Sequence, residues 1–449
     1  MHALRDTHHT QTVGHNKKKM EIRKTSEVYG VSNEEILSYI EREDVDDLFV
    51  NGIDENKHII VFGSSKQGKS ALVNKHLSED KLVRINCVPK SQPSDIYKSI
   101  LRQLNVEFDL ETSSQTTIGY SGKGGLKAKV KVPLVADIEG ELGGQAERKK
   151  QTTVKTQTIE YNLELPQDIS EILKKIGFEY RIVLENFHYL DEETQRELAF
   201  HLRNFEDYNV LFVILGIWRE KNRLAQYNGD LQDRLIEIPV EPWEKEDFER
   251  VVKVGEPLLN VNFDKVLERL TGESFDSIGV FQELCKECCL LAGVKETQSQ
   301  TVTIEESHLD EAIQKKLGDY SGRHIRSIES FIEQKTKSSD KTPLFLAYYF
   351  IGVLLSQEFD DIVKGMKRRQ IQEGIQRVHH RPDDVRASDM SNFLHNIKDN
   401  QLKKNITPPI FDYDLSIRTL KIIDSTFYFF LRNFNCKELL EELDKPEGI

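Results

Sequence analysis

His58 to His76 reads HIIVFGSSKQGKSALVNKH. The apolar run at its start predicts a buried strand, and the segment from Gly68 predicts a helix. Between them, GSSKQGKS matches G-x-x-x-x-G-K-[ST], whose glycines let successive N–H groups point at phosphate oxygens, while the helix N-terminus adds positive charge. The stretch therefore predicts a nucleotide-binding loop made of Gly63, Ser64, Ser65, Lys66, Gln67, Gly68, Lys69, Ser70 and Ala71.

Lys69 and Ser70 carry the chemistry of this loop. Lys69 is predicted to hold the β- and γ-phosphates of ATP, and Ser70 to ligate Mg²⁺. A second magnesium ligand should end a neighbouring strand, and the apolar run 181–184 leads into Glu185. Asn186 follows, where many ATPases carry a catalytic glutamate. Because an amide is a poor base, the sequence predicts slow hydrolysis with water oriented by Asn186, or a base supplied elsewhere.

Four more charged residues are candidates for the same site. Asp191 and Glu192 could supply the base, although acids also suit a helix N-terminus, which is the interpretation we favour. Arg219 follows one apolar strand and Arg234 precedes another, so either could reach a γ-phosphate, in cis or from a neighbouring subunit. A surface salt bridge is the alternative for both arginines, more so for Arg219.

Short, nearly continuous apolar runs recur along the first half of the chain, as in strands buried on both faces of a parallel sheet. With helical segments between them, they predict a doubly wound α/β core of the P-loop NTPase type. The runs are Val83–Cys87, Tyr180–Leu184, Val210–Ile217 and Leu235–Val240. Ahead of the core, Ser32 to Arg42 predicts a helix whose capping box is Ser32 and Glu35.

Residues 111–161 interrupt the core, and this length is uncommon for a connection in such a fold. Between glycine clusters, apolar and charged residues alternate strictly. Folding about Leu134 brings three lysines opposite three acids in one register: Lys131 with Asp137, Lys129 with Glu139 and Lys127 with Glu141. The segment predicts a β-hairpin with one apolar face, which either packs on its own domain or protrudes toward a neighbouring subunit or partner.

The second half of the chain reads as two further regions. Helical periodicity predicts a helical lid over residues 244–335. Residues 336–449 follow the order helix, helix, helix, strand, strand, which resembles a winged helix. Its third helix lies beside His395, Lys398, Lys403 and Lys404, which is compatible with phosphate contacts to duplex DNA. Basic helices are also often only solvated, and winged helices also bind proteins.

The length and composition of the chain limit its domain count, its location and its binding partners. The chain has 449 residues, enough for two to four domains, and residues 1–24 read as a disordered tail. Five cysteines fit a reducing, cytoplasmic location, and we interpret Cys285, Cys288 and Cys289 as a buried helix face rather than a metal cluster. The longest apolar run, Leu344–Leu355, is too short to span a membrane. A net charge of -13 disfavours a protein that coats nucleic acid over its whole surface.

Several of these segments resemble the AAA+ superfamily, and within it the origin-initiator ATPases and the STAND-type signalling ATPases. VRINCVPKSQPSDIYKSILRQL, residues 83–104, is similar to the initiator pattern that follows the P-loop. ERED at residues 41–44 resembles the segment that packs near the adenine, Arg234 matches the place of an arginine finger, and Pro242-Trp243 resembles the pair that opens the lid. The resemblance implies an ATPase core over residues 25–243, followed by the lid and the winged helix.

The resemblance also implies a function. Asn186 replaces the usual second acid, and residues 277–282 of the lid lack the arginine often found there as a sensor. A nucleotide-gated switch tolerates both departures better than a motor. We expect an ATP-dependent switch that forms a homo-oligomer or binds a partner protein, with prokaryotic antiviral defence as the setting that the analogy suggests. The alternative is a DNA-binding ATPase of the initiator or transposition-regulator type.

Overall fold

The computed structural model describes residues 21–32, 35–110, 126–133, 156–333 and 343–446. Five parallel strands form the central sheet, in the order β2-β6-β7-β1-β8. Val61 in the middle of β1 lies between Leu215 of β7 and Ile238 of β8. The strands are β1 (His58–Phe62), β2 (Leu82–Asn86), β6 (Arg181–Glu185), β7 (Phe212–Gly216) and β8 (Leu235–Pro239), so all five runs predicted as strands are confirmed.

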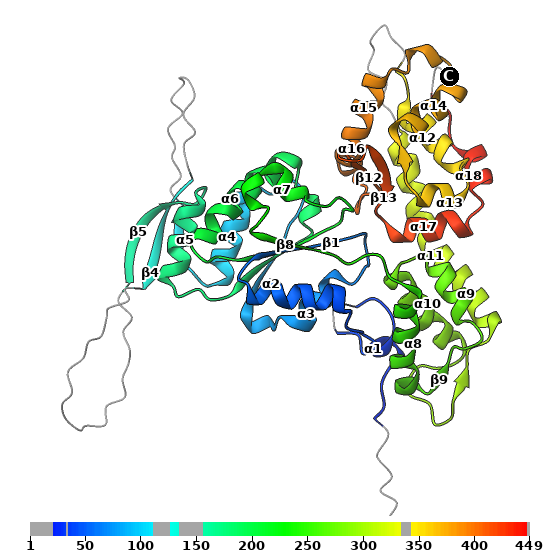
Figure 1. The fold of residues 1–449 in the computed structure, drawn as a ribbon, viewed down its shortest axis with the longest axis horizontal. Helices are drawn as coiled ribbons and strands as arrows, with labels where there is room; N and C mark the ends of the chain where they lie inside the picture. The colour runs from blue at the N-terminus through cyan, green and yellow to red at the C-terminus, as the bar shows by residue number, and fades with distance from the viewer. Residues whose placement is uncertain (1–20, 33–34, 111–125, 134–155, 334–342, 447–449) are drawn as a thin grey trace, which may run out of the picture.

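Helices cover both faces of this sheet (Figure 1). Alternate residues of β1 explain why: Ile59 and Val61 pack toward one helical layer, and Ile60 and Phe62 toward the other. The first layer is α2 (Leu48–Asp54) and α3 (Lys69–His76). The second is α4 (Pro93–Gln103), α5 (Pro166–Lys175), α6 (Glu192–Asp207) and α7 (Arg223–Tyr227). The predicted doubly wound P-loop core is confirmed.

The helix predicted from Ser32 to Arg42 is wrong. Residues 35–42 carry only a turn, and the helical segments come later, as a π-helical turn η1 (Glu43–Asp47) that continues into α2. Tertiary contacts override the local signal, because the Ser38 hydroxyl donates to the carbonyl of Val28 and Arg42 is buried. This segment lines the cavity described below.

The predicted hairpin register is also wrong. Strand β4 (Lys127–Pro133) pairs with β3 (Phe108–Leu110) and β5 (Thr156–Asn162), so Lys129 faces Glu160 and Lys131 faces Thr158. Asp137, Glu139 and Glu141 lie outside the described residues. Closing a longer loop costs little extra entropy, and β5 offers Ile159 and Tyr161 opposite Val130 and Ala128. The apolar face of β4 packs into the core, as the first of the two interpretations expected.

The lid contains four helices and a short parallel strand pair, β9 (Val261–Asn262) with β10 (Val302–Thr303). Its helices are α8 (Lys245–Leu259), α9 (Leu267–Ser274), α10 (Ile278–Leu291) and α11 (Glu306–Ile332), and the N-terminal turn α1 (Thr25–Val28) packs with them. Cys285, Cys288 and Cys289 are buried free thiols on α10, as expected. Helix α11 has 27 residues, about 40 Å of helix, and its far end enters the next region.

The C-terminal region is built around a three-stranded antiparallel sheet in the order β11-β13-β12. Helices α14, α15 and α16 lie in the chain between β11 and β12, which gives the winged-helix arrangement. The elements are α12 (Leu346–Leu355), α13 (Phe359–Val363), β11 (Met366–Lys367), α14 (Arg368–Val378), α15 (Ala387–His395), α16 (Ile397–Lys403), β12 (Phe411–Asp414), β13 (Thr419–Ile422), α17 (Ser425–Asn433) and α18 (Cys436–Glu442). No helix in the described part of the chain is long and apolar enough to cross a membrane.

Two of the lysines proposed for phosphate contacts to DNA are used inside the protein instead. Lys398 is buried, and burial and the nearby Arg223 lower its pKa to about 7. The Lys404 ammonium donates to the carbonyls of Ser330 and Phe331 at the end of α11, at 2.9 and 2.8 Å. The expected basic surface beside the third helix is therefore reduced to its exposed members.

Candidate nucleotide site

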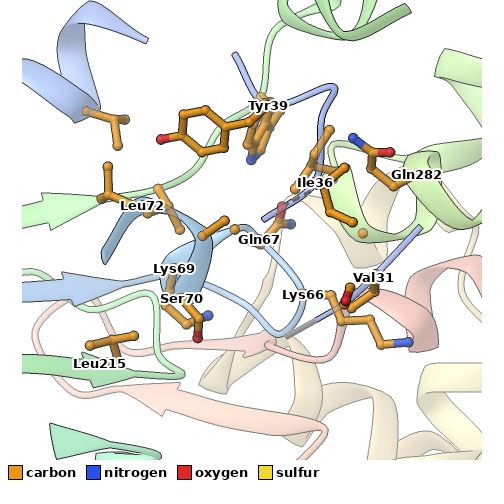
Figure 2. Close-up of a pocket in the computed structure, with 18 of the residues that line it drawn as sticks. Val31, Ile36, Tyr39, Lys66, Gln67, Lys69, Ser70, Leu72, Leu215 and Gln282 are labelled. Atoms are coloured by element: carbon orange, nitrogen blue, oxygen red, sulfur yellow. Dashed lines mark hydrogen bonds between the residues drawn. The ribbon is translucent and has the colours of Figure 1, made fainter. Parts of the chain in front are cut away.

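The loop 63–70 joins the end of β1 to the start of α3, as the sequence predicts (Figure 2). Gly68 takes a left-handed conformation with φ of 83°, which a side chain would strain, immediately before Lys69 opens the helix. The Lys69 ammonium donates to the carbonyls of Gly63 and Ser64 at 3.0 and 2.5 Å, so it folds back over the loop. The loop thus presents a lysine and a helix N-terminus at one point.

A cavity of about 340 Å³ opens beside this loop. Apolar side chains line part of it, among them Val31, Ile36, Leu72 and Leu215, together with Tyr39 (Figure 2). The Tyr39 hydroxyl donates to Asp46 at 2.6 Å, and burial, together with this contact, raises the pKa of Tyr39. An apolar cavity that ends at a phosphate-binding loop has the form expected for a nucleotide base and its phosphates.

The carboxylate of Glu185 at the end of β6 lines the same cavity as Ser70. A hydroxyl and a carboxylate oxygen are suitable ligands for Mg²⁺, so both predicted ligands fit the ion. Arg84 of the neighbouring strand β2 pairs with Glu185 and also with Glu79, at 2.6 Å. Magnesium would therefore have to compete with a guanidinium for Glu185.

The Asn186 amide donates to Asn86 at 2.6 Å.

The two candidate arginines lie at opposite ends of the sheet. Arg219 follows β7 and reaches the P-loop, where its Nε donates to the Ser64 hydroxyl at 2.8 Å and its guanidinium pairs with Glu241 at 3.1 Å. Arg234 precedes β8 and pairs with Glu206. Five strand residues separate it from the P-loop end, roughly 16 Å, so Arg234 cannot reach the nucleotide of its own chain. A finger role for Arg234 remains a prediction for a neighbouring subunit only.

Asp191 and Glu192 begin α6. The Asp191 carboxylate accepts the N–H of Thr194 at 2.8 Å, and Glu192 pairs with Arg196 at 2.9 Å. Both contacts are local to the helix, which supports the structural interpretation that we favoured over a base.

Glu241, between β8 and the lid, is a participant that the sequence did not indicate. Its carboxylate accepts the N–H of Ser64 at 2.9 Å and the Gln67 amide at 2.8 Å, in addition to Arg219. The only hint in the sequence was the next residue, Pro242, which we interpreted as part of the pair that opens the lid. One carboxylate therefore connects two residues of the P-loop to Arg219.

No protein-family profile matches the chain, and no curated protein matches it. Solved structures similar to it include a Walker-type ATPase of Pyrococcus abyssi, at 13% identity and a TM-score of 0.47 over 88% of this chain and 96% of that one. The Orc1 protein of Aeropyrum pernix, solved in complex with DNA, has 10% identity and a TM-score of 0.44 over 94% and 97%. A STAND protein of Pyrococcus horikoshii with a tetratricopeptide repeat sensor has 11% identity and a TM-score of 0.34, over 94% of this chain and 44% of that one.

The strand order decides the fold. The P-loop strand β1 and the strand β6 that ends in Glu185 are separated by β7, and the lid and the winged-helix arrangement follow in the chain. The fold is that of a P-loop NTPase. Membership of the AAA+ superfamily and of its origin-initiator branch stays a prediction from the sequence.

The lid packs directly on the P-loop. The N–H of Gly279 donates to the carbonyl of Lys66 at 2.9 Å, and the Gln67 amide donates to the carbonyl of Asp276 at 3.0 Å. A side chain at Gly279 would collide with Lys66, so glycine permits this approach. The lid is thus joined to the middle of the loop through Lys66 and Gln67.

The winged-helix region also contacts the P-loop. The N–H of Ser65 donates to the carbonyl of Ile423 at 2.9 Å, and the Ser425 hydroxyl donates to the carbonyl of Ser65 at 2.6 Å. The Ser65 hydroxyl donates to Asp424 at 3.1 Å. These partners are about 360 residues apart in the chain, and nothing local in the sequence indicates them.

A pH dependence follows from the environment of Lys69. Burial lowers its pKa to about 8, against a raising effect of Glu241. A bound phosphate favours the protonated ammonium, so ATP affinity should be full below pH 8 and should fall as pH rises above it, by up to about tenfold per pH unit. Titration with a fluorescent ATP analogue from pH 7 to 9.5 measures this. Lys69→Arg, which stays charged, should bind more weakly but with a flatter profile; an equally steep profile in that variant would contradict the assignment.

Proposed function

We propose that the chain is an ATP-binding, slowly hydrolysing molecular switch in which the nucleotide and the winged-helix region use the same loop. The observation that carries the proposal is the pair of backbone contacts that Ser65 makes with Ile423 and Ser425. In a P-loop, successive backbone N–H groups are the phosphate ligands. Here one N–H of the loop is already donated to the winged-helix region.

The coupling follows from this shared use. A triphosphate that draws the loop N–H groups toward its oxygens weakens the contact between Ser65 and Ile423, and docking of the winged helix weakens the nucleotide site by the same factor. The lid contacts at Lys66 and Gln67 move with the same loop. ATP would thus favour a released arrangement of the C-terminal region, and the nucleotide-free form the docked one.

We propose only slow ATP hydrolysis, with the following roles for the site residues. Lys69 would hold the β- and γ-phosphates, Ser70 and Glu185 would hold Mg²⁺, and Asn186 would orient water. When bound, the metal would neutralise charge that develops on the phosphates. The pairing of Glu185 with Arg84 and the amide at Asn186 both favour slow turnover. A neighbouring subunit would supply Arg234.

The output that we propose is ATP-dependent assembly with a further copy or a partner protein in the cytoplasm. The setting in prokaryotic antiviral defence is an analogy with STAND-type ATPases. Release of the C-terminal region would expose the P-loop face of α17, which gives a signal for assembly. The alternative, a DNA-binding initiator-like or transposition-regulator-like ATPase, has lost two of its proposed phosphate contacts, Lys398 and Lys404.

Size measurement by light scattering tests the proposal. Wild-type protein with ATP and Mg²⁺ is expected to change its mass or radius, whereas ADP, or ATP with Lys69→Ala, is expected to leave both unchanged. Duplex DNA forms the second arm of the experiment. An ATP-dependent complex with DNA that weakens with salt would replace the proposed function by the alternative, and no change with ATP in either arm would refute the switch.

A further inference from the structure

His188 is a buried imidazole that lies at the nucleotide cavity but has no role in the site described so far. It occupies the 3₁₀ turn η3 (Phe187–Tyr189) that follows Glu185 and Asn186, and only 1% of its surface is exposed. The residue lines the cavity together with Lys69, Ser70 and Glu185. Neither ring nitrogen has a hydrogen-bond partner among the described residues.

Among the described residues, the other buried histidines, His58, His324 and His379, each have at least one ring nitrogen with a hydrogen-bond partner. Both ring nitrogens of His58 are bonded, one to the carbonyl of Leu202 and one to the N–H of Phe212, at 3.0 Å each. One ring nitrogen of His324 is unpartnered, but the other is bonded to the Thr426 hydroxyl at 3.0 Å. The half-buried His201 is bonded to the Tyr97 hydroxyl at 2.6 Å. A buried polar group without a partner destabilises the protein that contains it, so two such nitrogens on one ring require an explanation.

The charges around His188 indicate what kind of partner fits. Burial lowers its pKa well below the usual value, and the positive charges of Lys398, Lys69 and Arg223 lower it further. The ring is therefore neutral, with one N–H donor, and it lies in a positive environment. An anionic oxygen near Lys69 would satisfy that donor and would be attracted by the same charges.

The same charges connect His188 to the winged-helix region. Arg223 of α7 forms an ion pair with Asp412 of β12 at 3.2 Å, and Lys398 of α16 is buried beside them. His188 thus shares the cavity with Lys69, and the charges of Arg223 and Lys398, in the buried group that joins the core to the C-terminal region, also act on its ring.

We propose that His188 is a positioning residue that distinguishes the triphosphate from the diphosphate: its imidazole donates a hydrogen bond to an oxygen at the terminal-phosphate end of bound ATP, and its movement alters the contacts of Arg223 and Lys398 with the winged-helix region. This inference rests on the proposed function and deepens it. It identifies the residue through which the terminal phosphate, rather than the nucleotide as a whole, acts on the C-terminal region.

The test compares His188→Phe, which keeps a planar ring without a donor, with His188→Gln, which keeps an N–H donor. Affinities for a non-hydrolysable ATP analogue and for ADP are measured by calorimetry with Mg²⁺. In His188→Phe the preference for the triphosphate should fall about tenfold or more, with ADP affinity unchanged within about twofold. His188→Gln should retain most of the preference. His201→Phe, which alters a histidine outside the cavity, is the matched control and should leave it unchanged.

A second readout separates this role from a structural one. Because His188 has no partner in the nucleotide-free protein, His188→Phe should not lower the melting temperature. An unchanged triphosphate preference in His188→Phe would overturn the proposal, and so would an equal loss of ATP and ADP affinity. If wild-type protein did not bind ATP at all, the proposed function itself would fail, so the two failures are distinguishable.

Discussion

Lys69→Ala is expected to weaken ATP binding by about a hundredfold. The ammonium makes charge-assisted hydrogen bonds to phosphate, worth about 3 kcal/mol in total, and each 1.4 kcal/mol corresponds to a factor of ten. Lys69 also holds the loop by donating to Gly63 and Ser64, so its loss loosens the preformed site as well. Titration with a fluorescent ATP analogue measures the effect.

Lys75→Ala is the matched control for this variant. Lys75 lies on the same helix α3, and its side chain is 34% exposed beside Glu35 and Glu41. Its loss should leave ATP affinity unchanged within about twofold, because surface ion pairs contribute little. Equal ATP affinity in Lys69→Ala and in wild-type protein would refute the phosphate site on which the proposed function depends.

Asp424→Ala is expected to release the winged-helix region from the P-loop and to destabilise the protein by about 3 kcal/mol. Asp424 is 1% exposed and accepts from Arg323 at 2.5 Å, from the Thr426 hydroxyl at 2.8 Å and from the Ser65 hydroxyl. Burial raises its pKa, but Arg323, His324 and the contacts with Thr426 outweigh burial, and the net pKa is lowered. Its removal leaves Arg323 and the P-loop without their shared partner.

Urea unfolding and small-angle scattering measure these two effects. The radius of gyration of nucleotide-free Asp424→Ala should exceed that of wild-type protein, whereas exposed Asp383→Ala should change neither quantity. Since the pKa of Asp424 is lowered in the folded state, its contribution is present above the ordinary carboxyl pKa and is lost as pH falls through the folded value. A variant as compact and as stable as wild-type protein would show that Asp424 does not hold the docked arrangement.

Much of the fold follows from sequence patterns that predict the same local structure whatever the rest of the chain does. The strands could be predicted because runs such as Val210–Ile217 are apolar on both faces, a composition that suits only a strand covered on both sides. The P-loop could be predicted because its spacing is a geometric requirement for phosphate contacts. The predictions that were wrong concern which segments pack together. The pattern of β4 fits more than one neighbouring strand, and β5 is its partner because Ile159 and Tyr161 pack there. The local sequence of Ser32–Arg42 favours a helix. Its contacts with Val28 and its place at the cavity override that preference.

The candidate site also contains features that the sequence predicts and features that only the tertiary structure shows. The sequence by itself determined the phosphate-binding loop, the position of Glu185 after a buried strand and the absence of a second acid at Asn186, because these depend on residues adjacent in the chain. Only the tertiary structure decided that Arg219 and not Arg234 lies at the P-loop of its own chain, that Lys398 is buried, and that Ile423 to Ser425 contact Ser65. The physical reason is that these contacts join residues up to about 360 positions apart, and their geometry is set by packing of whole elements rather than by local conformational preference.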